Sequence, residues 1–295
     1  MVSSIVGNYL IDKGLITQEQ FRDLLLDQQK VRVKLGLIAV AEGLMSQDEA
    51  DRVNRLQTVM DKRFGDIAVE KGYLTEGQVG SLLKKQGSAY LAFAQALENQ
   101  QLMTVEQLEQ FMLDYQYENH MTASDMEDIK SDDVDRILPL YLPVGSDKYL
   151  EIAGTAIRMM MRCVDTEIYP GKAYIASRVE ADNGALQRME GKSDIACALT
   201  GRGNELLYIA SAFGREAFPE VNEDALDAVG ELLNCINGMY ASEASKRGVT
   251  LELLPPEYST DITKAAGGKM LIIPLYVKGR RVNFLIAVDN RIELQ

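Results

Sequence analysis

Histidine is almost absent from this chain of 295 residues, which contains only His120. A catalytic triad with histidine would have to use that one residue, and a zinc site with several histidines is excluded. Cysteine is also scarce, and Cys163, Cys197 and Cys235 lie far apart in the sequence. Three widely spaced cysteines favour reduced, buried thiols over a disulfide framework. Without a nearby histidine base, a thiol nucleophile is disfavoured.

Basic residues and long apolar runs are scarce as well. Lys and Arg total 31 against 44 Asp and Glu, so the formal net charge is −13. Such an acidic surface repels phosphate backbones, which argues against a nucleic-acid polymer as partner. No run approaches the roughly 20 apolar residues of a membrane span, and the first residues lack the order of a signal peptide. We therefore expect a cytoplasmic protein, and its length suggests two domains.

One sequence motif recurs four times at intervals of 29 residues in the first third of the chain. Each copy has a Ser or Thr followed three residues later by Glu or Gln, the capping box of a helix start. The four pairs are Thr17 and Gln20, Ser46 and Glu49, Thr75 and Gln78, and Thr104 and Gln107. Glycines that suit helix ends precede three of them, at Gly14, Gly43 and Gly72. We therefore predict four helical hairpins over residues 1–118 that stack to bury their apolar faces.

The third copy has the fullest form of the motif, with Arg63-Phe64-Gly65, then a glycine with apolar neighbours, then a helix that ends in Gln86. This pattern resembles the N-terminal domain of type II secretion and type IV pilus ATPases. Some of those relatives bind cyclic di-GMP through tandem copies, so the resemblance implies Arg63, Gly65 and Gln86 as ligand residues. Only this copy carries the arginine, whose guanidinium suits phosphate or guanine edges better than lysine does. A structural or protein-docking module is the other interpretation.

An acidic stretch follows the repeats at residues 119–136. Between residues 119 and 135 it has six acidic residues, one lysine and no apolar periodicity. This composition predicts a solvated linker in which His120 is an exposed loop residue. Residues 137–295 then form the second domain.

The second domain combines segments typical of strands with two long helices. The predicted helices span 148–164 and 224–247, and the predicted strands are 173–179, 195–199, 206–210, 249–254, 270–277 and 282–288. A hairpin turn at 201–204 joins the second strand to the third. The whole chain is therefore predicted as α+β, an all-α repeat module followed by a domain with a mixed or antiparallel sheet.

The helix at 224–247 has two distinct faces. Its apolar residues recur at spacings of three and four and predict a buried stripe of Leu226, Val229, Leu233, Ile236 and Tyr240. The opposite face carries Asp227, Glu231, Asn234 and Gly238. An ordinary solvated helix face has the same spacing, so the spacing alone leaves its role open.

The residues around this helix help to decide whether its polar face is an ordinary solvated surface or a functional site. Asp227, Glu231 and Asn234 are followed, after twenty intervening residues, by Pro255-Pro256. This order resembles the signature of the chemotaxis phosphatases CheC, CheX and FliY, and the flanking residues are most similar to CheX. The other long helix has Gly154 where a second asparagine would be needed. The resemblance therefore implies one active face per chain and, as in CheX, a homodimer through this domain.

The resemblance also implies a substrate, the phosphorylated receiver domain of a CheY-like response regulator. That substrate brings its own Mg²⁺ and lysine, so no cofactor or metal of this chain is expected. Phosphoryl transfer needs positioning more than covalent help, and an amide both accepts and donates hydrogen bonds. Asn234 would thus position the attacking water and Glu231 would dock the receiver's lysine. Asp227, Gly238, Pro255 and Pro256 are the remaining predicted docking residues.

Two other classes of function stay open. The domain could capture receivers without hydrolysing the phosphate, although it retains both Glu231 and Asn234. Alternatively, the chain is a signalling adaptor that responds to cyclic di-GMP, with the repeats as sensor and the second domain as output. Cys235, beside Asn234, is predicted to be a buried thiol without a redox role.

Overall fold

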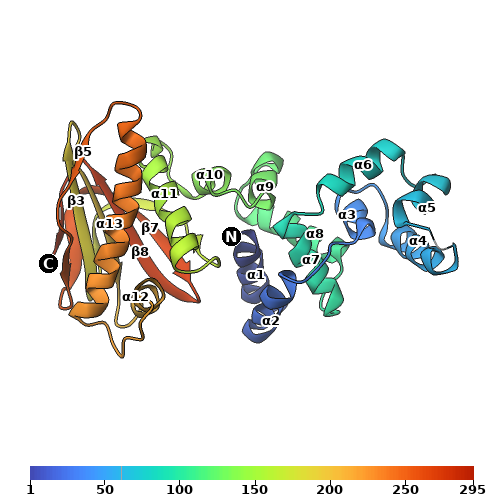
Figure 1. Ribbon diagram of the computed structural model, residues 1–295. Helices are drawn as coiled ribbons and strands as arrows, with labels where there is room; N and C mark the ends of the chain where they lie inside the picture. The colour runs from blue at the N-terminus through green and yellow to red at the C-terminus, as the bar shows by residue number, and fades with distance from the viewer. Residues whose placement is uncertain (61) are drawn as a thin grey trace. The chain divides into compact units, whose positions relative to one another are not determined.

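The computed structural model describes residues 1–60 and 62–295, which form two compact units (Figure 1). The N-terminal unit comprises residues 2–133, and the C-terminal unit comprises residues 134–295 together with Met1. The first is all-helical and the second has an antiparallel sheet with helices. The predicted α+β fold is therefore confirmed. Within the described residues, no helix is both long and apolar enough to cross a membrane.

The N-terminal unit contains four helical hairpins and one further helix in the part of the chain that is described. The helices are α1 (Val2–Asp12), α2 (Gln18–Gln28), α3 (Leu35–Ala41), α4 (Gln47–Met60), α5 (Phe64–Glu70), α6 (Glu76–Lys84), α7 (Ala89–Asn99), α8 (Val105–Glu118) and α9 (Ala123–Lys130). The predicted capping boxes are present at the starts of α2, α4, α6 and α8. The hairpins predicted from the repeat are thus confirmed.

The turn inside each hairpin uses a residue with left-handed backbone. Gly14, Gly43 and Gly72 have φ angles of 69°, 64° and 75°. In the fourth copy Gln101 takes the same conformation, with φ of 56°. Its turn keeps the matching hydrogen bond, from the N–H of Leu102 to the carbonyl of Leu97 at 3.0 Å. The helix-ending geometry therefore survives the loss of the glycine.

The hairpins do not stack in sequence order. Helix α7 of the fourth copy packs against α1 and α2 of the first, while α4 and α3 of the second copy pack against α5 and α6 of the third. Phe21 and Phe93 meet edge to face with ring centroids 6.2 Å apart. The side-chain amide of Gln28 donates to the carbonyl of Ala89 at 3.0 Å. The predicted stacking therefore pairs the first copy with the fourth and the second with the third.

The acidic stretch is not a tether throughout. Residues 123–130 form α9, whose Met126 and Ile129 are buried. Thr122 caps this helix with Asp125 in a capping box, and the preceding His120 has φ of 55° and is exposed, as expected. The stretch thus repeats the turn of the hairpins, and the linker prediction is corrected for these residues. The sequence signal was missed because Asp stands where the motif has Glu or Gln.

The C-terminal unit has one nine-stranded sheet among its described residues, and every pairing in it is antiparallel. Its helices are α10 (Val134–Ile137), α11 (Asp147–Cys163), α12 (Leu207–Gly214) and α13 (Glu223–Ser245), with a 3₁₀ turn at Leu138–Tyr141. The strands are β1 (Tyr169–Pro170), β2 (Tyr174–Glu180), β3 (Asn183–Gly191), β4 (Ile195–Gly201), β5 (Leu251–Leu253), β6 (Glu257–Ser259), β7 (Lys264–Val277), β8 (Arg280–Val288) and β9 (Ile292–Leu294). The path runs β1-β7-β8-β4-β3-β5, with β2 and β9 paired to β7 and β6 paired to β3.

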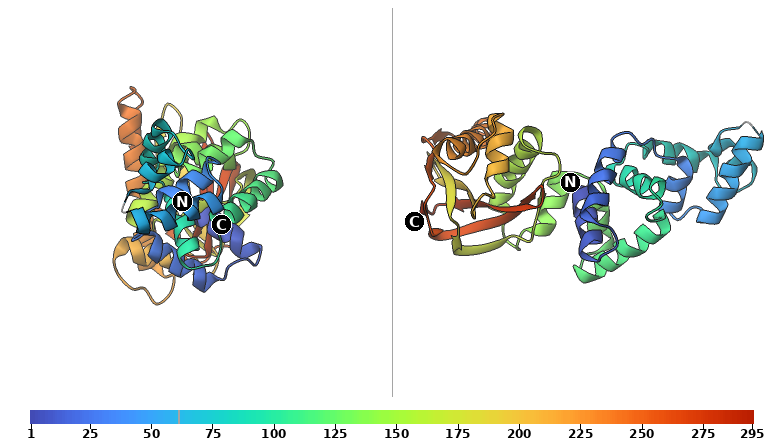
Figure 2. Two further views of the ribbon diagram at one scale, coloured as in Figure 1. Left: turned by 90° about the vertical axis from the view of Figure 1, so that its right-hand side faces the viewer. Right: turned by 90° about the horizontal axis from the view of Figure 1, so that it is seen from below.

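Helices α11, α12 and α13 lie on one face of this sheet (Figure 1, Figure 2). Helix α13 packs on β3, β4, β5 and β6, and it also contacts α11 and α12. The sheet also contributes to a separate apolar core, which is formed by residues such as Met270, Ile272 and Leu285. Helix α13 is therefore supported from beneath by β3, and this contact positions the candidate site.

Two sequence predictions in this unit are wrong. Residues 206–210 were expected to be a strand, but Leu207–Gly214 is helix α12. Residues 201–204 therefore lead from β4 into a helix and do not form a hairpin. A short apolar run is compatible with either a buried strand or a buried helix. In the structure this run is helical, and its Ile209 and Ala210 are buried. Strand β4 pairs with β3 and β8, and of these β3 was not predicted from the sequence.

Candidate functional site

The candidate site is built on α13, which begins with strong local signals. The side chain of Asn222 accepts from the backbone N–H of Ala225 at 2.9 Å and caps the helix. Glu223 and Asp224 follow in the first turn, where negative charge is favourable to the helix dipole. These contacts fix the start of the helix and hence the direction of every later side chain on it.

The two predicted faces of α13 are present in the structure. Leu226, Val229, Leu233 and Ile236 are completely buried, and Tyr240 is half-buried. On the other side, the residues predicted for the site are exposed or half-buried. Asp227 and Glu231 are exposed, and Asn234 and Gly238 are half-buried. An incoming protein surface can therefore reach all four residues of this stripe.

Asn234 is held by a residue that the sequence analysis missed. Its side-chain oxygen Oδ1 accepts a hydrogen bond from Nε2 of Gln187 at 2.8 Å. Gln187 lies on β3, directly beneath the helix, and is 1% exposed. The sequence pattern that could have identified Gln187 is a glutamine within an apolar strand. It was not recognised because strand β3 itself had not been predicted. The outward-facing amide thus has a fixed inner partner.

The two prolines lie beside the same helix, as the motif suggested. A Cβ atom placed on Gly230 would be 3.1 Å from Cβ of Pro256, so the loop touches α13 at this glycine. Pro256 is half-buried and Pro255 is exposed. The carbonyl of Leu254, just before them, accepts from Nε2 of Gln187 at 2.9 Å. The proline loop and Asn234 therefore share one partner on β3.

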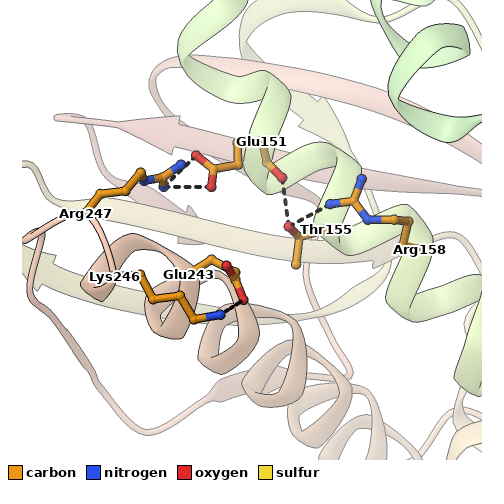
Figure 3. A network of polar contacts seen from close by, with 6 residues as sticks. All are labelled: Glu151, Thr155, Arg158, Glu243, Lys246 and Arg247. Atoms are coloured by element: carbon orange, nitrogen blue, oxygen red, sulfur yellow. Dashed lines mark hydrogen bonds and ion pairs between the residues drawn. The ribbon is translucent and has the colours of Figure 1, made fainter.

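The other long helix, α11, does not offer an equivalent face. Its Glu151 carboxylate pairs with Arg247, just past the end of α13, at 2.6 Å (Figure 3). One turn later, Thr155 donates to the backbone carbonyl of Glu151 and accepts from Arg158. Gly154 is buried, and a Cβ atom there would come within 3.0 Å of the Arg158 side chain. The α11 carboxylate is thus used inside the domain.

The cysteines differ from the predicted buried thiols at Cys235 and, in part, at Cys163. Cys197 is buried and Cys163 is half-buried, but Cys235 is exposed. The expected buried thiol is therefore wrong for Cys235, because this residue lies outside the apolar stripe of α13. Partial burial of the thiol raises the pKa of Cys235, and nearby Cys163 and the charge of Glu231 raise it further.

The N-terminal repeats contain a separate cavity of about 600 Å³. Its lining residues come from the second and third copies and are Arg32, Val33, Lys34, Leu35, Asn54, Gln57, Phe64 and Gln86. Of the three residues predicted to bind a ligand, only Gln86 lines it, and its amide donates to the carbonyl of Val33 at 3.0 Å. Arg63 pairs with Asp66 at 3.1 Å. Gly65 packs against Val79 within the hairpin.

Comparison with known proteins gives the class of the C-terminal domain. The sequence model of the family "Chemotaxis phosphatase CheX" matches residues 184–274, which include α13 and the proline loop. The C-terminal domain is therefore CheX-like. An uncharacterized protein of Picosynechococcus sp. (strain ATCC 27264) is 32% identical over 95 residues, which are 30% of this chain and 52% of that protein. The chain thus spans about half the length of this curated relative.

Solved structures of low identity align with the chain over about half its length. A CheC-like protein from Shewanella sp. PV-4 is 19% identical, with a TM-score of 0.41 over 47% of this chain and 94% of that one. CheX from Desulfovibrio desulfuricans is 18% identical, with a TM-score of 0.41 over 48% and 97%. CheX from Borrelia burgdorferi, solved with CheY, BeF₃ and Mg²⁺, is 17% identical, with a TM-score of 0.39 over 48% and 97%.

Proposed function

We propose that this protein hydrolyses the aspartyl phosphate of a CheY-like receiver domain, with Asn234 and Glu231 as the residues that act on it. The observation that carries the proposal is their placement one turn apart on the accessible face of α13, inside the segment that matches the CheX family. Glu231 has no hydrogen-bond or ion-pair partner among the described residues. Its carboxylate is thus available to a cation brought by another protein.

Each side chain has a distinct task. The carboxylate of Glu231 would dock the ammonium group of the receiver's active-site lysine by a charge-assisted contact. The Asn234 amide, one turn further on, would reach the phosphoryl group. Its Nδ2 donates to a phosphoryl oxygen, and the lone pair of Oδ1 that Gln187 does not use accepts from the attacking water. The receiver supplies its own Mg²⁺ as part of the substrate, so this chain contributes positioning alone.

The docking edge extends along α13 in both directions from Glu231. Asp227 lies one turn earlier and also lines a hollow of about 420 Å³ with Phe218 and Pro219. Gly238 lies one turn after Asn234 and leaves room for a close approach by backbone. Pro255 and Pro256 complete the edge on the neighbouring loop.

The test is the rate of phosphate loss from a panel of phosphorylated receivers, measured with the full-length chain. We expect the wild type to accelerate the loss for its cognate receiver, and Asn234→Ala to reduce the acceleration strongly, to a rate that can still be measured, while still binding that receiver. Asn290→Ala is a matched control, because the side chain of this half-exposed asparagine donates to the carbonyl of Val288 and is not part of the predicted site. If wild type and Asn234→Ala both bind the phosphorylated form without hydrolysis, the domain is a receiver-binding module.

The cavity in the repeats favours a second candidate function, the binding of cyclic di-GMP. Arg32 and Lys34 are exposed at its rim and Gln57 and Gln86 line it, so cationic and amide donors meet there. Guanidinium groups suit phosphate and guanine edges. Calorimetric titration of the full chain with cyclic di-GMP tests this, with Arg32→Ala expected to weaken binding and Arg22→Ala, in the first copy, as control. Absence of binding near micromolar concentration would exclude the nucleotide.

A further inference from the structure

Gln187 is a buried polar residue in the middle of strand β3. It lies on β3 opposite Cys197, is 1% exposed, and uses both ends of its amide. Nε2 donates to Oδ1 of Asn234 at 2.8 Å and to the carbonyl of Leu254 at 2.9 Å, and Oε1 accepts from Nδ2 of Asn237 at 2.8 Å. Burial of an amide is unfavourable unless it is hydrogen-bonded, and here three partners satisfy it.

These contacts determine which way the amides face. The carbonyl of Leu254 can only accept a hydrogen bond, so the nitrogen of Gln187 must point toward it. The same nitrogen then requires an acceptor on Asn234, which turns Oδ1 inward and Nδ2 away from β3. The opposite rotamer of Asn234 would set two N–H groups against each other. The backbone of the proline loop thus dictates the orientation of the Asn234 amide through Gln187.

We propose that Gln187 is a positioning residue for the phosphatase reaction, acting through Asn234. This inference rests on the proposed function, because it assigns a task to the partner of the proposed water-positioning amide. A terminal amide torsion has a broad, roughly two-fold preference and is not fixed by its own chain. Gln187 removes that freedom before the receiver docks, so that Nδ2 is presented to the phosphoryl group and the second lone pair of Oδ1 is held in one direction for the attacking water. The second amide, Asn237, holds Gln187 from the far side.

The same network links two parts of the docking edge. Leu254 directly precedes Pro255 and Pro256, which lie against α13. A displacement of the proline loop therefore moves the carbonyl that orients Gln187. Receiver contacts on the prolines and alignment of Asn234 thus depend on one buried side chain, which lies 47 residues before Asn234 and 67 before Leu254 in sequence.

The decisive experiment is steady-state kinetics of Gln187→Met in the full chain. Methionine keeps the length and volume of glutamine but neither donates nor accepts in the same geometry. We expect kcat to fall roughly 10- to 100-fold, the range for a misplaced catalytic group, while KM for the phosphorylated receiver stays within about twofold. Asn183→Ala is the matched control, since Asn183 is also buried on β3 but bonds to the carbonyl of Gly203. It should retain the wild-type kcat.

Two further readouts separate positioning from a merely structural role. In the Asn234→Ala background, Gln187→Met should change kcat no further, because its effect passes through Asn234. In ¹H–¹⁵N spectra, the side-chain amide of Asn234 should give one sharp pair of signals in wild type and broadened signals in Gln187→Met. If Gln187→Met does not fold, Asn237→Ala tests the same network with the outer contacts intact.

The outcomes distinguish the two proposals. An unchanged kcat in Gln187→Met, or additive losses in the double variant, overturns the positioning role while the phosphatase stands. If wild type hydrolyses no receiver phosphate, the proposed function fails. The amide signals of Asn234 are then the remaining test of whether Gln187 fixes the orientation of the Asn234 side-chain amide. Signals that are identical in wild type and Gln187→Met would then reject the role of Gln187 as well.

Discussion

Glu151 of α11 and Arg247, just past the end of α13, form an ion pair in which both carboxylate oxygens lie within 2.8 Å of Nη2 of the arginine. The pair joins two helices that cover the same face of the sheet. It also distinguishes Glu151 from Glu231, an exposed residue of α13 whose carboxylate pairs with no residue in the described part of the chain. The two glutamates therefore offer matched sites for testing which carboxylate serves a partner.

Replacement of Glu231 by Gln should weaken docking of the phosphorylated receiver. The variant keeps the shape of the side chain but loses the charge that meets the receiver's lysine, and charge-assisted contacts are about twice as strong as neutral ones. We expect kcat/KM to fall about tenfold or more, as measured by phosphate release. Glu151→Gln should leave kcat/KM unchanged. Equal losses in both variants would contradict the assignment.

The glycines of α13 provide a second matched pair. A Cβ atom at Gly238 has its nearest neighbour, Leu253, at 3.9 Å, whereas one at Gly230 would be 3.1 Å from Pro256. Gly238→Ala should therefore stabilise the domain by up to about 1 kcal/mol through helix propensity, yet weaken receiver binding if the receiver approaches closely there. Gly230→Ala should gain less stability, because the proline loop must shift. Thermal unfolding and calorimetric binding measure both effects.

The reactivity of the Cys235 thiol can show whether a receiver occupies the docking edge on α13. The raised pKa of Cys235 means that less thiolate is present at neutral pH than for an ordinary cysteine, so alkylation of Cys235 should be slow at that pH. The alkylation rate should rise with pH, and it should do so at higher pH than for a cysteine with an ordinary pKa. Glu231→Gln removes one of the charges that raise this pKa and should speed alkylation at pH 7. A bound phosphorylated receiver should slow it. Peptide mass spectrometry of iodoacetamide-treated protein follows Cys235 separately from Cys163, and unchanged labelling with receiver would place the docking face elsewhere.

Glu98 in the N-terminal unit should make stability depend on pH. Burial raises its pKa in the folded state, although its carboxylate accepts from the N–H of Val105 at 3.3 Å. A raised carboxyl pKa favours folding at low pH, and that contribution is lost as pH rises from the unfolded value through the folded one. Glu98→Gln keeps the acceptor without the charge.

The variant should therefore have the higher Tm at pH 7, and this advantage should shrink as pH falls below the folded pKa of Glu98. Calorimetric scans from pH 4 to pH 7 measure the difference, and comparison with wild type cancels the other carboxylates. An advantage that grew toward low pH would show that the pKa shift has the opposite sign.

Local features of the structure follow from nearby residues. The capping boxes at Thr17, Thr75 and Thr104 and the left-handed glycines depend on contacts within a few positions, so their spacing predicts them. The two long helices and the strands at 270–277 and 282–288, which correspond to β7 and β8, were predicted from the same kind of local pattern. Position within α13 also assigns Glu231 and Asn234 to one accessible face, since helical spacing alone determines that geometry.

Features that depend on distant residues were not predictable in this way. The apolar run at 206–210 forms a helix because α13 covers it. The repeats pair the first copy with the fourth, where Phe21 of α2 meets Phe93 of α7 edge to face. Periodicity identifies a face that must be buried, but it does not identify the partner that buries it.

The sequence by itself determined the approximate extents of α11 and α13, the four hairpins and the order Asp227, Glu231, Asn234 along one side of α13. These depend on backbone geometry over one or two turns. Only the tertiary structure decided that Glu151 is used within the domain and that Gln187 turns the Asn234 amide outward. Both depend on hydrogen bonds between elements far apart in the chain, and such contacts exist only once β3, α11 and α13 have packed together.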